Sequence, residues 1–144
     1  TANVLKECYK DLKLHNVNLK GTILKPNMIL PGSKSKNKSN PEEIAKLTLK
    51  CLKENVPSEV PGIAFLSGGQ AEIEATKNLN RINLMNDSSF ILSYSYGRAL
   101  QQSALKFWSK NINDIKGTQA VFSHRAKMCS LASIGKWSED IEKN

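Results

Sequence analysis

Gly62-Ile63-Ala64-Phe65-Leu66-Ser67-Gly68-Gly69 is the stretch of sequence that decides the fold. Its apolar run has no polar alternation and is bounded by glycine on both sides, which is typical of a strand buried on both faces of a parallel sheet. A shorter apolar run at residues 19–24 is broken by Gly21 and stopped by Pro26, and a third run occupies residues 90–96. These runs predict three strands.

Helical patterns lie between and around the predicted strands. They cover residues 4–15, a segment starting at Asn40-Pro41, residues 71–82, about 100–108, and about 114–133. The expected inward-facing residues are, in chain order, Val4, Leu5, Cys8, Leu12, Ile44, Leu47, Cys51, Leu52, Ala71, Ala75, Leu79, Ile82, Ile115, Phe122, Ala126 and Cys129. Strands that alternate with helices predict an α/β fold with a parallel sheet and right-handed crossovers.

The composition indicates one globular domain. The chain has 144 residues, 40% of them hydrophobic and 24% charged. We find no apolar run long enough to span a membrane and no signal-peptide pattern after Thr1, so we expect a cytoplasmic protein that is not inserted in a membrane. The net charge of +8 leaves nucleic acid, a membrane surface and an anionic metabolite open as ligands, because charge alone does not choose among them.

Cysteine and histidine are too sparse for a disulfide framework or a metal site. The three cysteines are far apart and odd in number, and His15 and His124 are the only histidines. We therefore expect reduced cysteines buried as small hydrophobic residues, and no zinc or di-iron site.

A lysine-rich segment precedes Asn40. Lysines at positions 34, 36 and 38 alternate with serine and asparagine, which predicts a flexible, solvated loop at residues 33–40. Because no aromatic residue interleaves the lysines, the segment gives little support to nucleic-acid binding.

Candidate functional residues follow all three predicted strands. Carboxyl ends of parallel strands meet at one edge of a sheet, where ligands bind in such folds. Lys25, Ser67-Gly68-Gly69 and Ser95-Tyr96-Gly97-Arg98 should therefore converge. Glycine turns that lead into helices offer backbone N–H groups to an anion, and an arginine offers a bidentate fork to phosphate. The pattern predicts a phosphorylated ligand.

Each of these features also has a simpler interpretation. Lys25 could be an ordinary surface lysine, and Ser67-Gly68-Gly69 an ordinary tight turn. Lys25, however, lies between Leu24 and Pro26 inside an apolar run, where we expect desolvation to disfavour its charged form. A neutral amine is a nucleophile that can condense with a ketone.

Three segments together resemble one enzyme family. Leu24-Lys25-Pro26-Asn27-Met28, Phe65-Leu66-Ser67-Gly68-Gly69-Gln70 and Ser95-Tyr96-Gly97-Arg98-Ala99-Leu100-Gln101 are similar to successive signatures of class I fructose-bisphosphate aldolase, a glycolytic lyase with a (β/α)8 barrel. The resemblance implies that Lys25 forms a Schiff base with the substrate ketone, without metal or cofactor. It further implies that the C1 phosphate and neighbouring hydroxyls are bound by Ser67, Gly68, Gly69, Ser95, Gly97 and Arg98.

The resemblance also implies that residues 1–144 are the C-terminal portion of one aldolase barrel domain, with strands six to eight. We expect the general acid/base to lie outside this chain, little activity from the chain alone, and a cut end at Thr1. The family suggests a homotetramer and cytoskeletal partners, and the open sheet edges predict pairing with another copy or with the rest of the enzyme. Two alternatives remain, a non-catalytic scaffold fragment and a basic nucleic-acid binder.

Overall fold

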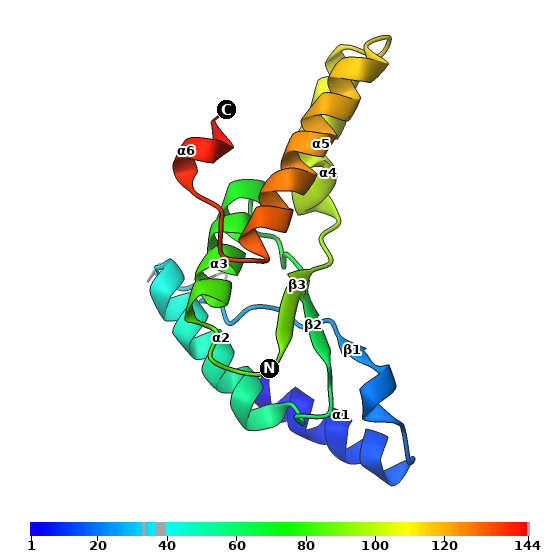
Figure 1. Cartoon of the computed structure of the whole chain (residues 1–144), viewed down its shortest axis with the longest axis vertical. Coiled ribbons are helices and arrows are strands. Elements are labelled where there is room, and N and C mark those ends of the chain that lie inside the picture. The colour runs from blue at the N-terminus through cyan, green and yellow to red at the C-terminus, as the bar shows by residue number, and fades with distance from the viewer. Residues whose placement is uncertain (33, 37–39, 144) are drawn as a thin grey trace.

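Three parallel strands form the centre of the molecule. The computed structural model describes residues 1–32, 34–36 and 40–143. Its sheet has the order β1 (Ile23–Leu24), β2 (Gly62–Phe65) and β3 (Ile91–Tyr94), and helices α2 (Pro41–Asn55) and α3 (Glu72–Met85) connect the strands on one side of it (Figure 1). The predicted α/β fold with a parallel sheet is confirmed.

The other elements extend this unit at both ends. Helix α1 (Ala2–Leu14) and a 3₁₀ turn (Leu19–Gly21) precede β1. After β3, helices α4 (Arg98–Lys110) and α5 (Ile115–Ala132) pack together and project away from the sheet, and a short α6 (Glu139–Glu142) lies near α3 and α5 (Figure 1). In the described part of the chain, no helix is long and apolar enough to cross a membrane.

Side-chain caps start two of the long helices. The Asn40 side chain accepts a hydrogen bond from Glu43 N at 2.9 Å, and Pro41 occupies the first helical position, as the sequence predicts. Asp114 accepts one from Gly117 N at 2.8 Å and starts α5. The predicted loop at 33–40 lies partly outside the described residues, because positions 33 and 37–39 are not among them.

The sheet has one covered face and one open face. Its register pairs Ile63 with Leu92 and Gly62 with Ile91. Ile63 and Leu92 are buried under the helices, whereas Ile23 and Ile91, on the opposite face, are 71% and 72% exposed. The expectation that β2 is buried on both faces is therefore wrong for this chain, because its helices cover only one face.

The core fills the space between the covered face and the helices. Its largest fully buried apolar side chains are Phe65, Met28, Ile63, Leu79, Ile82 and Val60. Strands β2 and β3 and helix α3 all contribute to one cluster with the inner side of α2. This packing holds the strand ends in place relative to the helices that follow them.

Several predicted inward-facing residues are exposed. On α5, Ile115 and Phe122 are exposed, because only the C-terminal half of that helix packs on α3 while its N-terminal half contacts α4 at the projecting end (Figure 1). On α2, Leu47 is exposed because Ala45 and Thr48 occupy the buried side.

Further differences concern the N-terminal part. Helix α1 buries Leu5 and Tyr9, so Val4 is exposed. Cys8 is also exposed and Cys51 is half-buried. The expectation that all three cysteines are buried is therefore wrong, and only Cys129 is buried. The strand expected at 19–24 shrinks to two residues, because Leu19–Gly21 forms a 3₁₀ turn that Asn18 caps through Lys20 N at 3.2 Å. Ala71 is exposed as the residue before α3.

Candidate functional site

The three candidate segments meet at one edge of the sheet. Lys25 directly follows β1, Ser67 to Gly69 follow β2, and Ser95 to Arg98 follow β3. Hydrogen bonds continue the ladder beyond the strands, with Leu66 N donating to Pro26 O at 3.0 Å and Ser95 N donating to Phe65 O at 2.8 Å. The convergence predicted from the sequence is thus present in the backbone.

Lys25 lies on the open face of the sheet. Alternation along the chain puts it on the same side as Ile23, and it borders a groove of about 460 Å³ between α1 and β1 that Cys8 and Leu66 also line. The lysine itself is exposed. The expected burial of Lys25 is wrong for this chain, because its apolar neighbours Leu24 and Pro26 point toward the helices.

The first glycine turn depends on a backbone conformation that only glycine adopts readily. Gly68 and Gly69 have φ of +61° and +86°, both in the left-handed region. Gln70 N donates to Ser67 O at 3.1 Å and closes the turn immediately before α3. Both glycines are exposed, so a ligand can approach their backbone closely.

A pair of side chains, the half-buried Gln70 and the buried Asn78, fixes this turn, and sequence reasoning missed it. The Gln70 amide donates to Ser67 O at 2.8 Å and accepts from Asn78 Nδ2 at 2.6 Å, and it also lies 3.6 Å from the Met28 sulfur. Asn78 is only 1% exposed on α3. An asparagine between the apolar positions Ala75 and Leu79 was the signal that could have pointed to it.

The second turn leads into α4 and is held from behind. Tyr96 is buried and donates its hydroxyl hydrogen to Ala75 O at 3.1 Å, and burial raises the pKa of this phenol far above its usual range. Gly97 precedes the helix, and its carbonyl accepts from Leu100 N and Gln101 N at 3.0 and 3.2 Å. Arg98 is exposed at the first helical position.

The two helix starts differ in charge. The first turn of α3 contains Glu72 and Glu74, whereas the first turn of α4 contains no acid and begins with Arg98. A helix N-terminus carries a partial positive charge that favours an anion, and arginine strengthens it. The start of α4 is therefore the more electropositive of the two.

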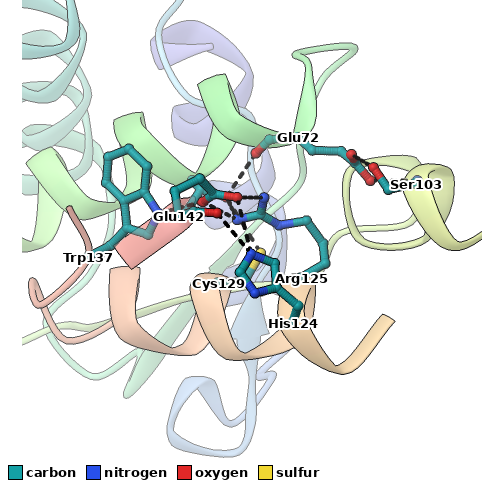
Figure 2. A network of polar contacts seen from close by, with 8 residues as sticks. Glu72, Ser103, His124, Arg125, Cys129, Trp137 and Glu142 are labelled. Carbon is teal, nitrogen blue, oxygen red and sulfur yellow. Dashed lines mark hydrogen bonds and ion pairs between the residues drawn. The ribbon is translucent and has the colours of Figure 1, made fainter. Parts of the chain in front are cut away.

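A polar network behind the site ties α3, α5 and α6 together (Figure 2). Arg125 on α5 is 4% exposed and donates to both carboxylate oxygens of Glu142, at 2.6 and 3.0 Å, and to Thr76 Oγ1 at 3.1 Å. Trp137 Nε1 donates to Glu142 at 2.6 Å, and the backbone oxygen of Glu142 lies 3.1 Å from His124 Nε2.

The carboxylate in this network is held in its charged form. Burial opposes ionisation of Glu142, but the hydrogen bonds from Arg125 and Trp137 and the charge of Arg125 outweigh it, so the pKa of Glu142 lies below its usual value. The sequence does not predict the pairing of Glu142 with Arg125, because the two residues belong to different helices.

Metal ligands do not gather at the site. Within residues 1–32, 34–36 and 40–143, no three His, Cys, Asp or Glu side chains lie close enough to hold an ion. The groups that the site offers are an amine, backbone N–H groups and a guanidinium.

Comparison with known proteins identifies the family. The family model described as "Glycolytic: Fructose-bisphosphate aldolase class-I" matches residues 1–144. The chain belongs to the class I fructose-bisphosphate aldolases. Its three parallel strands and their helices form part of a TIM-barrel-like fold.

Relatives in this family are considerably longer than the chain. It is 50% identical to cytosolic fructose-bisphosphate aldolase 4 of Arabidopsis thaliana, over 99% of this chain and 36% of that protein. It is 53% identical to the cytoplasmic isozyme of fructose-bisphosphate aldolase of Spinacia oleracea, over 93% of this chain and 38% of that protein. A solved aldolase of Plasmodium falciparum, in complex with TRAP and a small-molecule inhibitor, matches with a TM-score of 0.91 and 39% identity, over 95% of this chain and 40% of that one.

Proposed function

We propose that this chain supplies the Schiff-base lysine and the C1-phosphate site of a class I fructose-bisphosphate aldolase. The whole enzyme would cleave fructose 1,6-bisphosphate into dihydroxyacetone phosphate and glyceraldehyde 3-phosphate. The observation that carries the proposal is the position of Lys25 and both glycine turns at one sheet edge, in a chain that matches the aldolase family over residues 1–144.

Lys25 would form the covalent intermediate. Its neutral amine attacks the C2 ketone, and loss of water leaves an iminium ion. When the bond between C3 and C4 breaks, its electron pair moves toward the iminium nitrogen, while a base removes the proton of the C4 hydroxyl. Protonation of C3 and hydrolysis of the imine then release dihydroxyacetone phosphate and restore Lys25.

The exposure of Lys25 bears on how active this chain can be. Relatives have additional chain, which would cover the open sheet face and remove water from the lysine. We expect that additional chain to supply the general acid/base as well. The 144 residues alone should therefore cleave the sugar slowly or not at all, because an electron sink without a positioned base provides only part of the rate.

The two turns would bind the C1 phosphate. Backbone N–H groups at Gly68, Gly69 and the start of α4 suit phosphate oxygens, and the exposed guanidinium of Arg98 can form a charge-assisted pair with them. Ser67 and Ser95 would contact neighbouring hydroxyls.

The family suggests further properties of the whole protein. We propose that residues 1–144 form the C-terminal part of one barrel domain, with strands six to eight, in a cytoplasmic homo-oligomer such as a tetramer. The relatives named cytosolic or cytoplasmic support the location. We also propose contacts with cytoskeletal proteins, which co-sedimentation tests.

Amide chemical shifts test the phosphate site. The ¹⁵N-labelled chain is titrated with dihydroxyacetone phosphate, and we expect the largest shifts at Gly68, Gly69, Gly97 and Arg98. Arg98→Gln should weaken binding by about ten-fold or more, because it removes a charge-assisted hydrogen bond. Lys106→Gln removes an exposed lysine further along the same helix and should have little effect. Shifts confined to other regions, or equal effects of both variants, would refute the assignment.

A further inference from the structure

One carboxylate joins the start of α3 to the second turn of α4. Glu72 is the first residue of α3 and lies three positions after Gly69. Its Oε1 accepts a hydrogen bond from Ser103 N at 2.9 Å, and its Oε2 accepts one from Ser103 Oγ on α4 (Figure 2). Both carboxylate oxygens are therefore directed to the helix that follows the second turn.

The backbone oxygen of Glu72 is also hydrogen-bonded. Thr76 donates its hydroxyl hydrogen to the backbone oxygen of Glu72 at 2.8 Å, and Thr76 Oγ1 accepts from Arg125. Arg125 is anchored in turn by Glu142. Glu72 is thus bound to α4 through its carboxylate, and its backbone oxygen is linked through Thr76 to Arg125 on α5.

A carboxylate at this position would ordinarily disturb an anion site. Acidic side chains in the first turn of a helix are attracted to the free N–H groups there, and they compete with phosphate for them. Glu74, in the same turn, does approach Ala71 N at 3.4 Å. Glu72 instead has its acceptors engaged by Ser103, so its carboxylate does not compete with a phosphate for these N–H groups.

We propose that Glu72 is a positioning residue for the phosphate site, which it builds by fixing the first glycine turn and the start of α4 relative to each other through Ser103. This inference rests on the proposed function for its ligand. It concerns two residues that do not touch the phosphate themselves. Their contact adds to the hydrogen bond from Tyr96 to Ala75 O, which also holds the second turn against α3.

The proposal predicts an effect opposite to simple electrostatics. Glu72→Gln removes a negative charge near an anion site, and charge alone would tighten phosphate binding. Loss of positioning instead weakens it, and we expect about a ten-fold rise in the Kd for inorganic phosphate, as for other residues that orient a binding group. Glu74→Gln removes the same charge from the same turn without touching α4, so it should leave binding equal or tighter.

Substitutions at the partner test the same contact. Ser103→Ala should weaken phosphate binding to a similar extent, and Ser103→Thr, which keeps the hydroxyl, should restore it. The double variant Glu72→Gln with Ser103→Ala should lose little more than either single variant, because both act through one contact.

Hydrogen exchange separates this inference from the proposed function. In the ligand-free 144-residue chain, Glu72→Gln and Ser103→Ala should speed exchange of the Leu100 and Gln101 amides, which bond to Gly97 O, while Glu74→Gln should not. Unchanged exchange, or tighter phosphate binding in Glu72→Gln, would overturn the positioning role. If the unsubstituted chain binds no phosphate but its exchange responds as predicted, the phosphate assignment fails and the helix coupling stands.

Discussion

Replacing Glu142 by glutamine should destabilise the chain through Arg125. Glutamine keeps the shape of the side chain and one acceptor oxygen, but it removes the charge that balances a guanidinium only 4% exposed. Arg125 Nε is already buried without a hydrogen-bond partner among the described residues. The variant therefore leaves a buried cation with little compensation.

The structure sets the size of this effect. Removing one partner of a buried ion pair costs about 3–5 kcal/mol. Glu142 keeps a side-chain exposure of 11%, and glutamine can still accept one bond, so we expect a loss of roughly 2–3 kcal/mol in the free energy of unfolding. For a chain of this size, that corresponds to a fall of roughly 4–12 °C in the unfolding midpoint.

Urea unfolding followed by circular dichroism, at one protein concentration, measures the loss. Glu139→Gln is the matched control, because its ion pair with Lys77 at 2.5 Å lies at the surface and should contribute little. Adding Arg125→Met to Glu142→Gln should recover part of the stability, because the unbalanced charge is gone. A Glu142→Gln variant as stable as the unsubstituted chain at pH 7 would refute the reasoning.

The pH dependence gives a second check. Because the pKa of Glu142 is lowered on folding, its contribution is fully present above the unfolded value of about 4.3 and is lost as pH falls through the lower folded value. The difference between the unsubstituted chain and Glu142→Gln should therefore shrink below pH 4. A difference that stays constant from pH 7 to pH 3 would contradict the ion pair.

Three further substitutions test local features of the fold by urea unfolding. Gly117→Ala should cost about 1–2 kcal/mol, because the added methyl group collides with the Asp114 side chain that caps α5. Gly69→Ala should cost a similar amount, about 1–2 kcal/mol, because the φ of Gly69 is +86°. Gly32→Ala is the control and should be neutral, because a methyl group there would meet open space. Equal losses of stability in the two variants would contradict the turn geometry. Asn40→Ala removes the cap of α2 and should cost about 1 kcal/mol, with no loss expected if the cap does not form.

Local signals predicted the parts of the site that depend on neighbouring residues. The glycine pair after β2 and the Asn40 cap are properties of a few consecutive positions, and both are present as expected. The convergence of Lys25 with the two turns follows from parallel strands and short connections, so it too could be inferred from the sequence.

Features that depend on which surfaces meet could not be predicted in the same way. Glu72 and Ser103 are 31 positions apart on two helices, and nothing in either local pattern indicates that they pair. Ile115 has the spacing of a buried residue but lies at the projecting end of the α4 and α5 pair. Lys25 is exposed because one sheet face is open, which is a property of the whole assembly rather than of its neighbours in sequence.

Borohydride trapping tests the central role of Lys25 most directly. The chain is mixed with dihydroxyacetone phosphate, with and without the additional barrel segment of a relative supplied as a separate polypeptide, then reduced and mapped by mass spectrometry. We predict a reduced adduct on the peptide that contains Lys25, lost in Lys25→Arg and kept in Lys20→Arg. An adduct on another lysine, or none when the complementary segment is present, would contradict the account.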